Sequence, residues 1–229
     1  RVTLQKINDA LELGEGETAS EIYDRAKENA EPNLEMFIHV TKDGFGAIGH
    51  VDICYKGRII SFGNYDTNSE RLFGAMGDGV LFSADREKYI EFCKRENHKT
   101  LLGYGLALSP EQLAAIDKEI AKLMSLTVPW DPPKTVKPKR PGIDKEEPMY
   151  AYKLKQEADG RLYKFTSSKF KTYFVMSTNC VLLADTIVGA AGTDILSVRG
   201  FISPGTYQDY LDKEFERPHS LVVTKRVYQ

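Results

Sequence analysis

Cys180 is the residue of this sequence whose position best suits covalent chemistry. It follows Asn179, a residue type that caps helices, and it opens residues 180–188, which we expect to form a helix that ends at Gly189. Free backbone N–H groups and the helix dipole at such an N-terminus favour the thiolate, which is the nucleophilic form of cysteine. A buried structural cysteine fits the local sequence equally well, because free cysteines are among the most buried residue types.

The two other cysteines fit structural roles better. Cys54 and Cys93 each lie inside an apolar pattern, so core packing or a mutual disulfide is the favoured interpretation. Three cysteines are too few for a disulfide scaffold.

Four histidines could supply the base that a nucleophilic cysteine needs. His50 is our candidate, because it begins an expected strand directly after Gly49, where another segment can approach closely. We interpret His39 as a hydrogen-bonded residue of an expected strand. His98 lies at a loop and His219 near the carboxyl end, and we expect both to be solvated.

The strand that His50 begins belongs to the clearest predicted hairpin, with arms at residues 50–55 and 58–64. A two-residue loop at positions 56 and 57 places Tyr55 opposite Arg58 and Asp52 opposite Ser61. With side chains alternating between faces, one face of the hairpin then carries His50, Asp52, Cys54, Ser61 and Gly63.

A cysteine at a helix N-terminus, packed against a sheet that presents a histidine, is the arrangement of papain-like sites. Here the histidine precedes the cysteine in the chain, which is the reverse of the order in papain. The sequence therefore predicts an α+β fold of the circularly permuted papain-like (NlpC-type) kind. In this fold an antiparallel sheet packs against helices, and the histidine strand comes before the cysteine helix.

Four stretches in collinear order resemble the Lnb-type amino-terminal periplasmic domain family, which is related to permuted NlpC-like peptidases and amidases. Residues 49–53 (GHVDI) and 60–66 (ISFGNYD) resemble its "GH" and "Y-x-x-G-x-(F/Y)-D" patterns. Residues 106–112 (LALSPEQ) resemble its "L-x-L-T-x-E-E" helix entry, and Asn179-Cys180 followed by Asp185 resembles its "N-C-T-T-x-x-x-D" segment. Two departures are the apolar pair after the cysteine, in place of two hydroxyl residues, and a proline-rich insertion.

The resemblance implies that Cys180 is the nucleophile and His50 the base. The third residue, which orients the imidazole, comes in NlpC-type sites from the strand after the histidine strand. Asn64 suits that polar role, Ser61 suits the simple hairpin register, and Asp66 is a further choice that could equally begin a turn. We expect the substrate to be contacted by Ser61, Asp66 and Asn179. The backbone N–H of Cys180 and a neighbouring polar group are the expected oxyanion donors.

The remaining pattern predicts a helical N-terminal segment (1–33) followed by one domain (34–229). Within 1–33 we expect two helical pieces over residues 4–30. The proline-rich stretch at 127–148 holds six of the ten prolines, and we expect it to be an extended surface excursion. Ser109, Pro110 and Gln112 predict a capped helix start. Other expected elements are strands at 36–40 and 101–108, a helix at 85–97, a hairpin of 150–155 with 161–165, a helix at 207–215 and a strand at 220–227.

Composition limits the partners. With 229 residues and a formal charge of −2, the chain gives no general reason to expect nucleic acid, and no apolar run approaches the ~20 residues of a bilayer span. No metal or nucleotide motif is present, so we expect no cofactor; the glycine-rich residues 74–79 suit a loop near the cleft mouth. The chain begins with Arg1, so we expect a missing signal or anchor and an extracytoplasmic location.

The function expected from these features is a secreted or cell-envelope thiol hydrolase that cleaves an amide bond of a peptide or of peptidoglycan. Two other functions stay open: a non-catalytic binding or scaffold domain, and a thiol-dependent acyltransferase acting on lipid. The sequence leaves the oligomeric state open.

Overall fold

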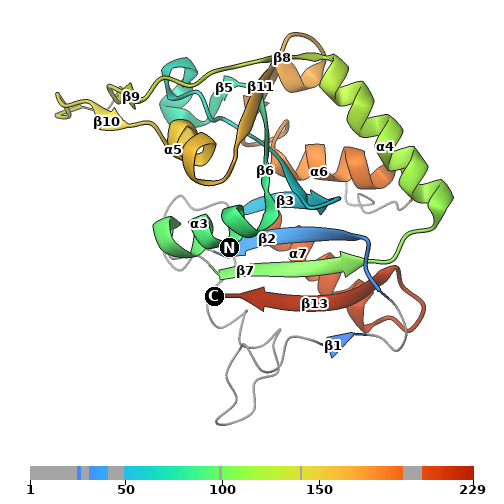
Figure 1. Cartoon of the computed structure of the whole chain (residues 1–229). Coiled ribbons are helices and arrows are strands. Elements are labelled where there is room, and N and C mark those ends of the chain that lie inside the picture. The colour runs from blue at the N-terminus through green and yellow to red at the C-terminus, as the bar shows by residue number, and fades with distance from the viewer. Residues whose placement is uncertain (1–24, 27–30, 41–48, 98–99, 140, 193–202) are drawn as a thin grey trace, which may run out of the picture.

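The computed structural model describes residues 25–26, 31–40, 49–97, 100–139, 141–192 and 203–229. A nine-stranded sheet runs through the molecule, with every neighbouring pair of strands antiparallel. It twists strongly, so that β2, β7 and β13 cross the view of Figure 1 while β6 and β11 run nearly upright. In spatial order the strands are β1 (Arg25–Ala26), β13 (Val222–Tyr228), β7 (Thr100–Leu106), β2 (Leu34–Val40), β3 (His50–Tyr55), β4 (Arg58–Gly63), β6 (Val80–Asp85), β11 (Arg161–Phe165) and β8 (Thr127–Pro129).

Two short two-stranded sheets lie outside the main one. One pairs β9 (Thr135–Val136) with β10 (Glu147–Pro148), and the other pairs β5 (Met76–Asp78) with β12 (Thr172–Phe174). Three 3₁₀ turns accompany them in the described residues: η1 (Thr67–Ser69), η2 (Leu72–Gly74) and η3 (Lys169–Lys171).

Helices cover both faces of the main sheet because its central strands are apolar on both sides. In β2, Met36 and Ile38 belong to one core cluster, while Phe37 between them belongs to the other. The first core also takes side chains from α4 (Pro110–Ser125), α6 (Cys180–Gly189) and α7 (Pro204–Glu216). The second takes side chains from α3 (Arg86–Asn97) and α5 (Tyr150–Glu157). The fold is therefore α+β with a large antiparallel sheet.

Most predicted elements are confirmed to within a few residues. The helix start at Ser109 is a complete capping box, in which the serine hydroxyl accepts the Gln112 N–H and the Gln112 side chain accepts the Ser109 N–H. The hairpin register is confirmed as well, with Tyr55 paired to Arg58. No helix among the described residues is long and apolar enough to cross a membrane.

The prediction of a hairpin around Asp159 is wrong, because the residues expected to form its first strand belong to helix α5. Ala151, Leu154 and Ala158 recur at helical spacing and are fully buried in the core that α5 shares with α3. Asp159 then takes a left-handed conformation (φ 50°), so the turn signal marks a helix end rather than a hairpin.

Two further expectations change. The expected N-terminal helical pieces lie mostly outside the described residues, but Arg25–Ala26 is the edge strand β1, paired with β13, and not helix. The proline-rich stretch begins inside the sheet, because its first residues form β8 against β11. The rest of that stretch, apart from residue 140, carries the small β9–β10 ladder and runs out from the body of the molecule (Figure 1).

Candidate active site

Cys180 is the first residue of α6, where the sequence placed it. The preceding Asn179 is extended and caps the helix: its side-chain oxygen accepts the N–H of Leu182 at 3.2 Å, and its side-chain N–H donates to the carbonyl of Val175 at 3.1 Å. Helix α6 packs on β3 and β4, which brings its N-terminus to the end of the sheet where His50 stands. The thiol is buried, with 5% exposure.

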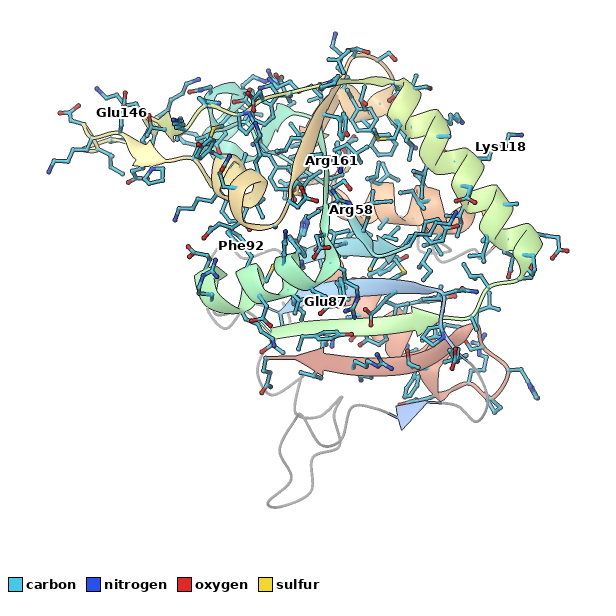
Figure 2. The ribbon with its side chains drawn as sticks, viewed as in Figure 1. Arg58, Glu87, Phe92, Lys118, Glu146 and Arg161 are labelled. Carbon is cyan, nitrogen blue, oxygen red and sulfur yellow. The ribbon has the colours of Figure 1, made fainter. Side chains whose placement is uncertain are left out.

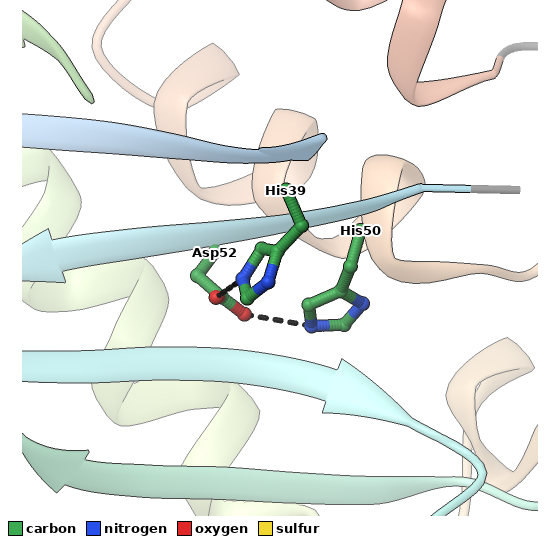
Figure 3. A group of neighbouring side chains, drawn as sticks. All are labelled: His39, His50 and Asp52. Carbon is green, nitrogen blue, oxygen red and sulfur yellow. Dashed lines mark hydrogen bonds and ion pairs between the residues drawn. The ribbon is translucent and has the colours of Figure 1, made fainter. Parts of the chain in front are cut away.

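His50 is the first residue of β3, and its ring links Cys180 to the sheet. Nε2 lies 2.6 Å from Ser61 Oγ and 2.7 Å from Asp52 Oδ1. Nδ1 points away from Asp52 (Figure 3) and is the ring nitrogen left for the hydrogen bond with Cys180. Burial lowers the pKa of His50, but the Asp52 carboxylate, the Cys180 thiolate and the hydrogen bonds to both outweigh it and raise the pKa to about 10. The imidazole is thus held as a cation beside the Asp52 carboxylate.

Asp52 is fully buried and joins His50 to a second histidine (Figure 3). One oxygen faces His50; the other contacts His39 Nε2 and accepts the hydroxyl of Tyr89 at 2.7 Å. Burial opposes the charged carboxylate, yet the positive charges of His50 and His39 and their hydrogen bonds hold the pKa of Asp52 well below its usual range. The side chain that orients His50 is therefore an ionised carboxylate.

Ser61 completes the contacts of His50 from the neighbouring strand. Its hydroxyl also lies 2.9 Å from the hydroxyl of Tyr65. The ladder of β3 with β4 pairs Ile53 with Ile60, so the same register brings Asp52 opposite Ser61, as predicted. The Ser61 hydroxyl on β4 and the Asp52 carboxylate on the paired strand β3 thus both contact Nε2 of His50.

A cavity of about 420 Å³ opens at this cluster. Polar and phenolic side chains dominate its lining, which consists of His39, His50, Gly63, Asn64, Tyr65, Glu70, Gly74, Tyr89, Tyr150 and Tyr173. Cys180 does not line the cavity itself, but it acts on Tyr173: burial first, and then the Cys180 charge, raise the pKa of that phenol. A ligand in the cavity would therefore meet His50 and Tyr173, two residues that interact with Cys180.

The remaining predicted site residues lie apart from the imidazole. Asn64 lines the cavity, but its side-chain N–H donates to the carbonyl of Met76 at 3.3 Å, so Asp52 and Ser61 stand where Asn64 was expected. Asp66 begins a turn, the alternative left open for it: it caps η1 and pairs with Lys164 at 2.6 Å. The structure thus brings together Cys180, His50 and Ser61, places Asn179 as a cap, and leaves Asn64 and Asp66 on the flank.

Three residues of the cluster were not among the predicted site residues. Asp52 stood on the predicted face of the hairpin beside His50, and that alternation was the signal for it. His39 is the hydrogen-bonded sheet residue that was expected, but its partner is the same carboxylate. Tyr89 comes from α3, and nothing in the local sequence links it to this strand.

The other cysteines and histidines take no part in the cluster. Cys54 and Cys93 are buried and form no disulfide, so the mutual disulfide considered for them is absent. Burial, only partly offset by Arg86, raises the pKa of Cys54 to about 12, which makes it a poor nucleophile. His219 is exposed, as expected, and residue 98 lies outside the described residues.

The donor atoms of His39, His50 and Asp52 lie within 4.8 Å of one another, close enough to share a metal ion. These atoms face one another as two imidazoles on one carboxylate. Hydrogen bonding and ion pairing account for how close they lie.

Comparisons with protein-family models, with curated proteins and with solved structures found no match to this chain. Its function has to be argued from the geometry of this cluster.

Proposed function

We propose that this chain is a secreted or cell-envelope thiol hydrolase that cleaves an amide bond, with Cys180 as nucleophile and His50 as base and acid. The observation that carries the proposal is the position of the His50 ring, between the buried carboxylate of Asp52 and the thiol of Cys180. A nucleophile, a base in contact with it and a third group that orients the base are the parts that nucleophilic acyl transfer requires.

The reaction follows from these positions. The Cys180 thiolate attacks the carbonyl carbon of the amide, and the His50 imidazolium gives its proton to the amine as the C–N bond breaks. Water then attacks the resulting thioester while neutral His50 takes its proton, which releases a carboxylic acid and restores the thiolate and imidazolium. Asp52 holds the ring and stabilises its charge at both stages.

The N-terminus of α6 suits the negative charge that develops on the substrate oxygen. The backbone N–H of Cys180 lies at the positive end of the helix dipole, where an oxyanion is stabilised. Asn179 uses its side chain to cap the helix, so it keeps that N-terminus in place rather than serving as a free donor.

The fold supports a permuted papain-like interpretation. An antiparallel sheet presents His50 at the start of one strand, and the later helix α6 packs against that strand and its neighbour with Cys180 at its N-terminus. The lining of the cavity favours a polar substrate: four tyrosines and Glu70 suit a peptide or a peptidoglycan stem better than an acyl chain.

The direct test is mass spectrometry of cell-wall digests from several wall types, incubated with wild type and with Cys180→Ala. We expect new amine and carboxylate termini that only the wild type produces, and a Cys54→Ala control that keeps this activity. Identical product profiles for wild type and Cys180→Ala across all walls would remove the wall-hydrolase proposal.

Reactivity of the thiol provides a test that needs no substrate. Iodoacetamide near pH 7 should alkylate Cys180 of the wild type faster than it alkylates a model thiol. The rate for wild-type Cys180 should also be at least about tenfold higher than the rate for Cys180 in the His50→Gln variant. Cys93, buried in the same molecule, is the internal control. Alkylation of Cys180 at the rate of a model thiol, unchanged in His50→Gln, would contradict the ion pair on which the proposal depends.

A further inference from the structure

A second cavity, of about 280 Å³, lies between α4, α6 and the sheet, and it shares no lining residue with the cavity at His50. One part of its wall is apolar and consists of Ile60, Leu81, Ile120, Leu123, Met124 and Ile187. Ile187 is seven residues along α6 from Cys180, which is about 10 Å of helix. The second cavity therefore reaches α6 about two turns beyond Cys180 and is separate from the cavity at His50.

One side of this cavity is cationic. Arg58 on β4 and Arg161 on β11 both line it, and Ser83 lies between them on β6. Ser83 accepts a hydrogen bond from Arg58 Nε at 3.2 Å and stands opposite Arg161 in the strand ladder. The two arginines lie close together over the sheet, whereas Lys118 projects from α4 away from them (Figure 2). Guanidinium groups set in this way bind carboxylates and similar anions through paired N–H donors.

Among the described residues, the carboxylates that pair with this rim are fewer than its cations. Lys56 also lines the cavity, and it pairs with the single acidic residue there, Asp117, at 3.0 Å. Arg58 pairs with Asp159 at 2.9 Å. Arg161 has no hydrogen bond and no ion pair among the residues that the structure describes, so one guanidinium at an apolar cavity is left for a ligand.

We propose that this cavity binds a single-chain anionic amphiphile of medium length, such as a fatty acid, with its head group at Arg161 and Arg58. Charge complementarity selects the anion, and the aliphatic wall selects the chain. The volume of about 280 Å³ is just below the usual range for small-molecule sites, about 300–1,000 Å³, so it suits one short chain rather than a two-chain lipid. The proposal does not depend on the hydrolase activity.

Calorimetric titration of the whole chain with octanoate and decanoate, below their micelle concentrations, tests this site. We expect saturable 1:1 binding that tightens by at most about fourfold for each added methylene. Arg161→Gln should weaken decanoate about tenfold, because a hydrogen bond to a charged group is lost. Lys118→Gln is the matched control, since it removes an exposed cation that does not line the cavity, and it should bind as wild type does.

Two further sets of variants locate the binding site of the ligand. Met124→Trp fills the cavity and should abolish binding while the far-ultraviolet circular dichroism stays that of wild type; Ile120→Trp repeats the test if the first variant does not fold. Cys180→Ala should bind decanoate normally, which separates this site from the proposed active site. Absence of saturation, equal binding of decanol and decanoate, equal loss in Arg161→Gln and Lys118→Gln, or loss of binding in Cys180→Ala would each overturn the proposal.

Discussion

Replacing Asp52 with asparagine removes the charge that holds His50 protonated while keeping the shape of the side chain. In the wild type, Asp52 Oδ1 lies 2.7 Å from His50 Nε2 in a fully buried position. Opposite charges whose centres are about 4 Å apart attract by about 4 kcal/mol at an effective dielectric constant of about 20. That energy corresponds to about 3 pKa units. The pKa of His50, raised to about 10 in the wild type, should therefore fall to about 7 in Asp52→Asn.

The same change alters how stability depends on pH. The folded pKa of His50 lies above its unfolded value, about 6.5, so its protonation stabilises the wild type fully below about pH 6.5. This contribution is lost as the pH rises toward 10. In Asp52→Asn the pKa values of His50 in the folded and the unfolded chain nearly coincide. The free energy of unfolding, measured with urea, should therefore fall less between pH 7 and 9.5 than it does in the wild type.

The assay is a proton–carbon NMR titration of the imidazole rings from pH 5 to 11, in which His50→Gln assigns the signal of His50. Asp66→Asn is the matched control, because it also neutralises a buried, ion-paired carboxylate beside the cavity, one whose partner is Lys164. A wild-type His50 that titrates near pH 6.5, or an equal shift in Asp52→Asn and Asp66→Asn, would refute the electrostatic reasoning.

Three further predictions concern the helix caps, a tightly packed glycine and a buried thiol. Asn179→Ala removes the cap of α6 and should lower the free energy of unfolding by about 1 kcal/mol, or the midpoint of a thermal scan by about 2–4 °C. Ser109→Ala should have the same effect at the start of α4. Unchanged stability in Asn179→Ala would contradict the capping role. Gly79→Ala would place a methyl group 1.7 Å from a carbonyl oxygen of η3 and should lower the free energy of unfolding in urea by more than about 3 kcal/mol. In Gly189→Ala the new methyl group meets open space, so the free energy of unfolding should rise by up to about 1 kcal/mol. Cys54 should resist iodoacetamide at pH 8 until the chain is unfolded, as mass mapping would show; labelling of the folded chain would mean that the burial of this thiol is wrong.

Those parts of the site that depend on local chemistry could be predicted from the sequence. A two-residue turn fixes the register of β3 and β4, so the shared face of His50, Asp52 and Ser61 follows from alternation alone. The cap at Asn179 is a similar case, because its side chain bonds a backbone group three residues away. Each of these features is decided within one turn or one hairpin.

The third residue of the site could not be chosen in that way, because its partners come from distant segments. Asp52 is buried as an anion only because His39 of β2 and Tyr89 of α3 also contact it. Asn64, the choice favoured for a polar orienter, follows the end of β4, where the chain turns and its side chain bonds Met76 instead. The helix α5 escaped prediction for a similar reason, since its buried face is defined by contact with α3.

Charge balance explains why one carboxylate contacts two histidines. Burial raises the pKa of Asp52, but the charges of His50 and His39 and their hydrogen bonds outweigh it and keep this carboxylate ionised. The charge of Cys180 and its hydrogen bond with His50 also contribute to the raised pKa of His50. A buried charge is tolerated in an interior where it is paired and hydrogen-bonded, and Asp52 is met by His50, His39 and Tyr89. His39 therefore does more than fill the sheet: its contact with Asp52 helps to keep ionised the carboxylate that holds the His50 ring.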